Sequence, residues 1–392
     1  MFWFVILAYF CAVMRKTFFF YSFLLFGFTF SYGQHTSKKS FAKTTIHKVP
    51  SYEALSERYS KAALSDSSAA LNYFNQGLSK CVLNDYVDAI IDFDKAFELD
   101  TNFKVIYNNR GLAKLELMQY GEALLDFNEA IQFDSANPYN YYYRALARFG
   151  MNDFNGTVND CKKTINMDPQ HAEAFATLGK AKFQLNENAE ALAYYNKAIQ
   201  LNPNLAWFYT ESARARYKLK DYEGAITDYS RAIKLDPQSV EAYSNRGIIK
   251  RTTKDLDGAL MDFNRAIDIN PFYAVSYFYR ATTEFQLNQK LEAIKDYDKA
   301  IELKPNYAIA FHNRGLAKYS LRNYIGAVTD FDSAILLKSD YAEAYSGRGA
   351  AKKGLQDRDG ACADWIKAIE LGNSNAAYML ENYCHIKAAG LK

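Results

Sequence analysis

Residues 172–205, AEAFATLGKAKFQLNENAEALAYYNKAIQLNPNL, contain the pattern that decides the fold. Apolar and small residues recur every three or four positions on both sides of residues 186–188, and this spacing is typical of amphipathic helices. Pro203 ends the second run, because proline cannot continue a helical hydrogen-bond ladder. The segment therefore predicts two antiparallel helices of about 12–14 residues joined by a short turn.

The same unit recurs with a period of 34 residues and without insertions. One column of small residues is Ala89, Ala123, Thr157, Ala191, Ala225, Ala259, Ala293, Ala327 and Ala361. An aromatic column is Phe93, Phe127, Tyr195, Tyr229, Phe263, Tyr297, Phe331 and Trp365, with Cys161 in the remaining place. A strict period of this length is typical of a stacked array, in which each unit buries its apolar face against its neighbours. It predicts nine units, at residues 70–103, 104–137, 138–171, 172–205, 206–239, 240–273, 274–307, 308–341 and 342–375.

These columns resemble the tetratricopeptide repeat, which has aromatic residues, Gly or Ala, and a closing proline at fixed offsets. The resemblance covers residues 70–375, although copies one, two, eight and nine lack the proline. It implies an all-α fold, a right-handed α-solenoid of helix–turn–helix hairpins. We expect residues 376–392 to form a capping helix and tail, with the helix at residues 375–386. The resemblance also implies a scaffold or adaptor that binds protein or peptide segments in a concave groove lined by the first helices.

Two columns carry opposite charges sixteen residues apart, one in each predicted helix of the unit. The pairs are Arg110 with Asp126, Arg144 with Asp160, Arg246 with Asp262, Arg280 with Asp296, Arg314 with Asp330, and Arg348 with Asp364. Because the turn lies about midway, antiparallel pairing brings each arginine level with its own aspartate. We interpret the pairs as structural salt bridges that specify the hairpin. The alternative is an anion site built from stacked arginines. Copy four has neither charge, since Leu178 is matched by Tyr194.

Positions one turn apart on the predicted first helices provide candidates for partner binding. They are Tyr142, Phe149, Lys180, Phe183, Arg214, Tyr217, Arg251, Phe278, Phe285, His312 and Tyr319. Aromatic side chains at both ends and Lys180, Arg214 and Arg251 at the centre favour a partner with hydrophobic anchors around an acidic middle. Tyr142 and Phe278 stand furthest from the packing columns and are the strongest contact candidates. The alternative is that these aromatic residues pack between adjacent first helices.

The sequence also bears on two other kinds of ligand, glycans and terminal carboxylates. Aromatic faces also stack on sugars, so a glycan- or cell-wall-binding envelope protein is the alternative function. Some tetratricopeptide proteins bind a terminal carboxylate through a clamp of Lys, Asn and Arg. The aligned places lack that pattern; they are Phe74, Asn108, Tyr142, Thr210, Ser244 and Phe278.

Residues 1–33 have the features of a secretory signal peptide. Arg15 and Lys16 provide a positive region, residues 18–30 are apolar, and residues 31–33 place small side chains before Gln34. We therefore expect cleavage after Gly33 and export to the periplasm or envelope of a bacterium. The alternative is an uncleaved membrane anchor, because residues 2–13 add a second apolar run. Neither this run nor residues 18–30 reaches the roughly 20 residues that span a bilayer comfortably.

The segments before and after the signal-like features are residues 1–13 and residues 34–69. Residues 1–13 precede the positive region and are predicted to be an upstream extension. Residues 34–69 are polar and rich in serine and lysine, which is typical of a flexible linker.

Two of the cysteines are placed to meet at the C-terminal end. Cys362 and Cys384 each lie eleven residues from Asn373, so an antiparallel register brings them together. In an oxidising compartment they can form a disulfide, and in a reducing one they stay free thiols. Cys81 and Cys161 are expected to pack inside helices as small hydrophobic residues.

Nothing in the sequence indicates catalysis, a cofactor or nucleic-acid binding. The five histidines, His35, His47, His171, His312 and His385, form no spaced cluster with Cys or carboxylates, so we expect no metal site. Phosphate-binding loops and nucleophile motifs are absent from the sequence. The formal net charge is only +3, which gives no general affinity for nucleic acid. We therefore expect a protein that is not an enzyme.

Overall fold

The structure is a computed structural model that describes residues 68–386. These residues belong to one compact unit. The predicted signal segment and extension, residues 1–33, lie outside the described residues, as does the predicted linker up to residue 67. The first described helix begins at Ser68, so residues 68 and 69 at the end of the predicted linker are helical.

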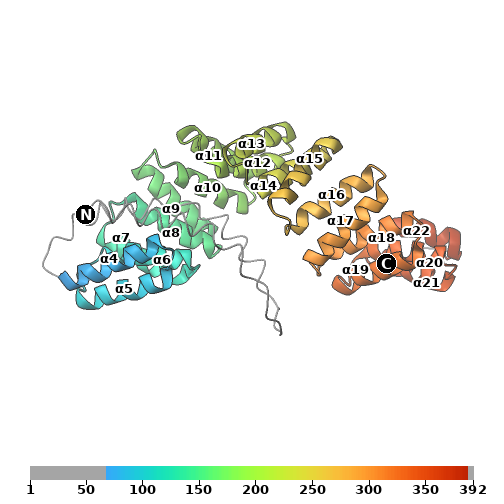
Figure 1. Ribbon diagram of the computed structural model, residues 1–392, viewed down its shortest axis with the longest axis horizontal. Coiled ribbons are helices and arrows are strands. Elements are labelled where there is room, and N and C mark those ends of the chain that lie inside the picture. Colours follow the sequence, from blue (N-terminus) through green and yellow to red (C-terminus); the bar gives the residue numbers. More distant parts are fainter. Residues whose placement is uncertain (1–67, 387–392) are drawn as a thin grey trace, which may run out of the picture. The chain divides into compact units, whose positions relative to one another are not determined.

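The described residues are helical with short turns, and eighteen helices pair in chain order into nine hairpins (Figure 1). The hairpins are α4 (Ser68–Val82) with α5 (Tyr86–Leu99), α6 (Ile106–Glu116) with α7 (Tyr120–Phe133), α8 (Pro138–Gly150) with α9 (Phe154–Met167), α10 (Ala172–Gln184) with α11 (Asn188–Leu201), α12 (Ala206–Lys218) with α13 (Tyr222–Leu235), α14 (Val240–Thr252) with α15 (Leu256–Ile269), α16 (Ala274–Gln286) with α17 (Lys290–Leu303), α18 (Ala308–Ser320) with α19 (Tyr324–Leu337), and α20 (Ala342–Gly354) with α21 (Arg358–Glu370).

Every hairpin turn has one residue in the left-handed region, at the same place in the unit. These residues are Asn84, Met118, Asn152, Asn186, Lys220, Lys254, Asn288, Arg322 and Gln356. Asparagine adopts this conformation more readily than other non-glycine residues, which explains its use at four of the nine turns. The next residue caps the second helix in most copies; for example, Asp221 Oδ1 accepts a hydrogen bond from Gly224 N at 3.0 Å. The turn and the cap together fix where the second helix begins.

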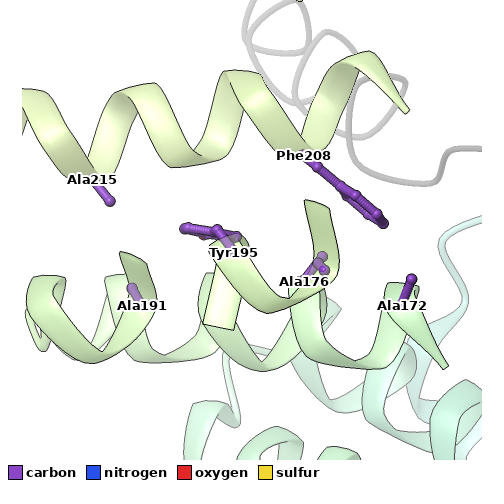
Figure 2. Close-up of a cluster of buried hydrophobic side chains, with 7 residues drawn as sticks. Ala172, Ala176, Ala191, Tyr195, Phe208 and Ala215 are labelled. Carbon is purple, nitrogen blue, oxygen red and sulfur yellow. The ribbon is translucent and has the colours of Figure 1, made fainter. Parts of the chain in front are cut away.

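Small and aromatic columns meet inside each hairpin. In the fourth hairpin, Tyr195 of α11 is fully buried, and a Cβ atom added at Gly179 of α10 would lie only 2.8 Å from its ring. Figure 2 shows Tyr195 facing Phe208 and Ala215, which belong to α12 of the next hairpin. The core is therefore a series of small clusters, each shared by neighbouring hairpins, as expected for a stacked array.

Successive hairpins pack on one another through two kinds of contact. The second helix of one hairpin contacts the first helix of the next, as α11 contacts α12. Most first helices also contact one another, including α8 with α10, α10 with α12, α14 with α16, and α16 with α18. This tandem packing confirms the predicted all-α solenoid. We call the side formed by α8, α10, α12, α14, α16 and α18 the first-helix face.

The C-terminal segment covers the last hairpin. Helix α22 (Asn375–Met379) continues into a π-helical turn, η1 (Leu380–Cys384), and His385 then takes a left-handed conformation. The expected helix at residues 375–386 is therefore too long, because the widened turn and left-handed His385 end it at Cys384. Leu380 packs against Trp365 of α21, and both side chains are fully buried. The segment thus shields the apolar surface that a further hairpin would otherwise cover.

Candidate functional site

The partner-binding candidates lie on the helices of the first-helix face. Tyr142 and Phe149 are on α8, Lys180 and Phe183 on α10, Arg214 and Tyr217 on α12, Arg251 on α14, Phe278 and Phe285 on α16, and His312 and Tyr319 on α18. Their surroundings differ strongly, and these differences decide which of them can meet a partner.

Tyr142 and Phe278 are buried, with 7% and 5% of their surface exposed. The prediction that they are the strongest contact candidates is therefore wrong. The physical reason is a contact with the following hairpin: the ring of Tyr142 lies 4.5 Å from that of His171, and Phe278 lies 4.9 Å from Tyr307. Both partners precede the first helix of the next hairpin, so these rings fill the junction between hairpins.

His312 occupies the same place in its own hairpin and is also buried. Its ring lies 5.0 Å from that of Tyr341, which precedes α20. Burial lowers the pKa of His312 to about 4, so the imidazole is neutral at physiological pH. His312 therefore belongs to the packing between hairpins as well.

The C-terminal ends of the first helices are more accessible. Tyr217 and Tyr319 have 37% and 38% of their surface exposed. Phe149, Phe183 and Phe285 are partly buried against the core clusters. These five aromatic residues mark the part of the face where side chains reach solvent.

Lys180 and Arg214 share a carboxylate that the sequence analysis missed. Lys180 Nζ lies 3.9 Å from Glu211 Oε1, and Arg214 Nη1 lies 3.1 Å from Glu211 Oε2. Lys180 Nζ also lies 5.2 Å from the centre of the Phe149 ring, and burial lowers its pKa. Glu241 lies near these groups, and its pKa is raised by burial and then by repulsion from Glu211. The spacing of three residues between Glu211 and Arg214 is the signal that could have revealed the pairing.

All six arginine–aspartate pairs are formed, each through two hydrogen bonds. Nε donates to Oδ2 at 2.5–3.0 Å and Nη2 donates to Oδ1 at 2.5–2.7 Å. The aspartates are buried, and the arginines are mostly buried beside them. In hairpin four, Leu178 and Tyr194 belong to one hydrophobic cluster instead.

Each of these arginines also holds the preceding hairpin, which the sequence analysis did not foresee. Nη1 donates at 2.5–2.9 Å to a residue sixteen positions earlier, which is Asp94, Asn128, Ser230, Asn264, Asp298 or Asp332. These acceptors stand two residues after the aspartate column, so the same alignment of copies could have found them. All three guanidinium nitrogens are engaged within the array, which leaves little donor capacity for the alternative of a bound anion.

A second column of cations contacts the aspartate column, which continues through Asp92 in hairpin one and Asp228 in hairpin five. It lies four residues after the arginine column, and its side chains contact the aspartate at 2.7–3.0 Å; its members are Lys80, Lys114, Arg148, Arg216, Lys250, Lys318 and Lys352. Hairpin seven departs from the pattern, because Glu284 occupies this place. Its Oε2 is buried without a hydrogen-bond partner, and burial followed by repulsion from Asp296 raises its pKa to about 7.

The remaining predicted groups are placed as follows. Cys362 and Cys384 form a disulfide with a Cα–Cα distance of 5.9 Å, and Cys81 and Cys161 are buried and take no part in that disulfide. Between residues 68 and 386, no three His, Cys, Asp or Glu side chains gather as metal ligands would. No helix in that same stretch is both long and apolar enough to cross a bilayer.

Comparison with known families agrees with this geometry. The family described as "TPR repeat" matches residues 213–250 and 281–322, and models described as "Tetratricopeptide repeat" match residues 172–205 and 240–273. No curated protein matches the chain in sequence.

Several solved structures share the fold. A tetratricopeptide repeat protein from Parabacteroides merdae is 18% identical, with a TM-score of 0.50 over 62% of this chain and 97% of that one. The APC/C hetero-tetramer Cut9-Hcn1 is 12% identical, with a TM-score of 0.52 over 85% of this chain and 80% of that one. YrrB, described as a TPR protein with an unusual peptide-binding site, is 21% identical, with a TM-score of 0.42 over 48% and 97%. At these identities, the likeness concerns the fold alone.

Proposed function

Because the chain belongs to the tetratricopeptide repeat family, we propose that it is a non-catalytic scaffold or adaptor that binds a segment of a partner protein. The observation that carries the proposal is the first-helix face, where the half-exposed Tyr217 and Tyr319 lie on the same set of packed helices as the cation Arg251. Helices fixed by their neighbours lose little conformational freedom on binding, so many weak contacts can add up. An extended segment lying along these helices would use them together.

We also propose that the protein works in an exported, oxidising compartment such as a bacterial envelope. The signal-like features of residues 1–33 support export, and the Cys362–Cys384 disulfide supports an oxidising environment. Mass spectrometry of the protein isolated from its own cells tests this proposal. A first residue of Gln34 is expected, whereas an intact residue 1 would favour the membrane anchor.

Photo-crosslinking tests the binding face directly. A photoreactive phenylalanine analogue is placed at Tyr217 or Tyr319, and at Leu336 as the control, which is 87% exposed on α19 away from the first helices. Irradiation in the producing cells should join discrete protein partners to the two tyrosine positions and leave Leu336 unlinked. Equal labelling at all three positions would refute the first-helix face as the binding surface.

The glycan alternative predicts a different result in a second measurement. Binding through charged side chains weakens as salt rises, whereas stacking on sugars hardly responds. The full chain is therefore mixed with isolated cell-wall glycan and sedimented at increasing ionic strength. Tight, salt-independent sedimentation together with no protein crosslinks would favour the glycan-binding function.

A further inference from the structure

The three cations proposed from the sequence have unequal electrostatic surroundings. Lys180 and Arg214 both lie against Glu211, and Glu241 adds a second negative charge nearby. Two positive and two negative charges therefore balance within hairpins four to six. A partner that brought a carboxylate to Lys180 or Arg214 would compete with Glu211 for the same N–H donors, so a large part of the gain would be cancelled.

Arg251 has no such carboxylate. Its Nε is buried and has no hydrogen-bond partner, and none of the residues from 68 to 386 forms an ion pair with its guanidinium group. Every arginine of the aspartate-bound column, in contrast, has its three nitrogens engaged. Nε has therefore lost water without gaining an acceptor, and no carboxylate neutralises the group, which makes the guanidinium a favourable site for an incoming acid.

Aromatic rings hold Arg251 in place. Its Cζ lies 5.6 Å from the centre of the Tyr279 ring, a distance at which the ring face attracts a cation. The Tyr279 ring is fixed in turn by Phe263, at 6.2 Å and nearly parallel, and by Phe278, at 5.1 Å and edge-on. The guanidinium group is thus held by packing, so less rotamer freedom is lost when it binds a ligand.

Tyrosine hydroxyls gather beside this ring. Tyr273 and Tyr307 interact electrostatically with Tyr279, and the pKa of each is raised chiefly by burial, so both keep their protons. Glu241 also raises the pKa of Tyr273, so this acid lies near the Tyr273 side of the group. Among residues 68–386, no hydrogen bond is formed by the hydroxyl of Tyr273 or Tyr307. The patch formed by Arg251, Tyr273, Tyr279 and Tyr307, which we call the Arg251 patch, therefore combines one unpaired cation with neutral donors and apolar ring surface.

We propose that the Arg251 patch, rather than Lys180 or Arg214, is where this face recognises an acidic side chain of its partner. The inference rests on the proposed function, since it names the chemistry of the segment that the first-helix face would bind. Arg251 would donate two parallel hydrogen bonds to an Asp or Glu carboxylate. The rings of Tyr279 and Tyr307 would contact an apolar side chain next to that acid. The places aligned with a terminal-carboxylate clamp are held by other residues, such as Ser244 and Phe278, neither of which carries a charge.

A displayed library of random twelve-residue peptides tests this recognition. The peptides are fused through their C-termini, so no terminal carboxylate is present and only side-chain acids can respond. The full chain is compared with Arg251→Gln and with Arg214→Gln, a matched control that removes an arginine of the same face already paired with Glu211. Circular dichroism verifies that both variants keep the helical content of the unaltered protein.

The proposal predicts that Asp or Glu is enriched beside an apolar residue in peptides selected by the unaltered chain and by Arg214→Gln. The enrichment should vanish with Arg251→Gln. In the best synthetic peptide, replacing the acid by its amide should weaken binding to the unaltered chain about tenfold and leave binding to Arg251→Gln unchanged.

Each other result contradicts a defined part of the reasoning. Peptides that bind but show no preference for acids, or acids whose effect persists in Arg251→Gln, would overturn the Arg251 patch and leave the scaffold function standing. If only Arg214→Gln lost the preference for acids, Arg214 rather than Arg251 would be the residue that recognises them, and the proposal would be wrong. A library that yields no binder to any of the three proteins would overturn the scaffold function and this inference with it.

Discussion

Replacing Glu284 should stabilise hairpin seven, because this residue interrupts a column of cations. In seven other hairpins, the equivalent Lys or Arg contacts the aspartate of the same hairpin at 2.7–3.0 Å. In hairpin seven, Glu284 faces Asp296, and Arg280 is the cation that offsets the two acids. The carboxylate Oε2 is buried and has no hydrogen-bond partner. The charged form of Glu284 is therefore disfavoured in the folded protein.

The pKa of Glu284 determines how much folding stability its charge costs and how that cost changes with pH. It rises from 4.5 to about 7 in the folded state, chiefly through burial. A rise of that size is equivalent to roughly 3 kcal/mol if it acts in full. Because the side chain is only half-buried, solvent screening reduces our expectation to about 1–2 kcal/mol. The folded state binds more protons than the unfolded state between pH 4.5 and about 7, so stability falls as pH rises through this window.

Two variants separate loss of charge from gain of an ion pair. Glu284→Gln removes the ionisation and should raise stability by about 1–2 kcal/mol at pH 8, with less than half of that gain at pH 5. Glu284→Lys should add a contact to Asp296 worth about 0.5 kcal/mol more at both pH values. Hydrogen exchange of the amides in α16 and α17 measures the local effect, and urea unfolding measures the whole chain.

Two outcomes would refute the reasoning. A gain for Glu284→Gln that is equal at pH 5 and pH 8 would show that ionisation of the carboxyl is not its cause. A Glu284→Lys protein less stable than Glu284→Gln at pH 8 would show that this place in hairpin seven does not accept the cation found in its neighbours.

Two further substitutions and one thiol count have defined expected results. Arg314→Ala leaves Asp330, which is 1% exposed, without its two-bond partner and should lower stability by about 2–4 kcal/mol while leaving binding by the first-helix face intact; unchanged thermal unfolding would contradict the structural role. Lys254→Gly relieves a φ of 72° and should stabilise its turn by about 0.5–1 kcal/mol; a lower melting temperature would contradict this expectation. Protein denatured without reduction should show two fewer free thiols than it has cysteines, because Cys362 and Cys384 are joined, and one thiol for every cysteine would exclude that bridge.

Interactions inside one hairpin could be predicted from the sequence, because their register follows from local spacing. Arg110 and Asp126 are sixteen residues apart around a turn, so helical geometry alone brings them level. The nine-fold repetition also predicted the small and aromatic columns, since each is seen against eight other copies. Repetition thus made a weak local pattern into a specific one.

Contacts between hairpins were harder to predict. Tyr142 was predicted to contact a partner, but its ring packs on His171 and is buried. His171 is a cap residue 29 positions later, and this position varies between copies. The pairing of Lys180 with Glu211 likewise joins two hairpins through residues outside any conserved column of the nine copies. Which side chains meet across such a junction depends on the angle between neighbouring helices. The spacing of residues within one helix does not determine that angle.

The arginine that holds two hairpins at once also bears on how the array comes apart. In a stacked array, stability is approximately a sum of unit terms and nearest-neighbour coupling terms. Nη1 of Arg144 adds to the coupling between hairpins two and three, and Nη1 of Arg246 adds to that between five and six. Leu178 and Ser212 provide no such bond, so the third-to-fourth and fourth-to-fifth couplings lack this contribution. Under force or mild denaturant, the chain should therefore unfold as two cooperative blocks that separate at hairpin four.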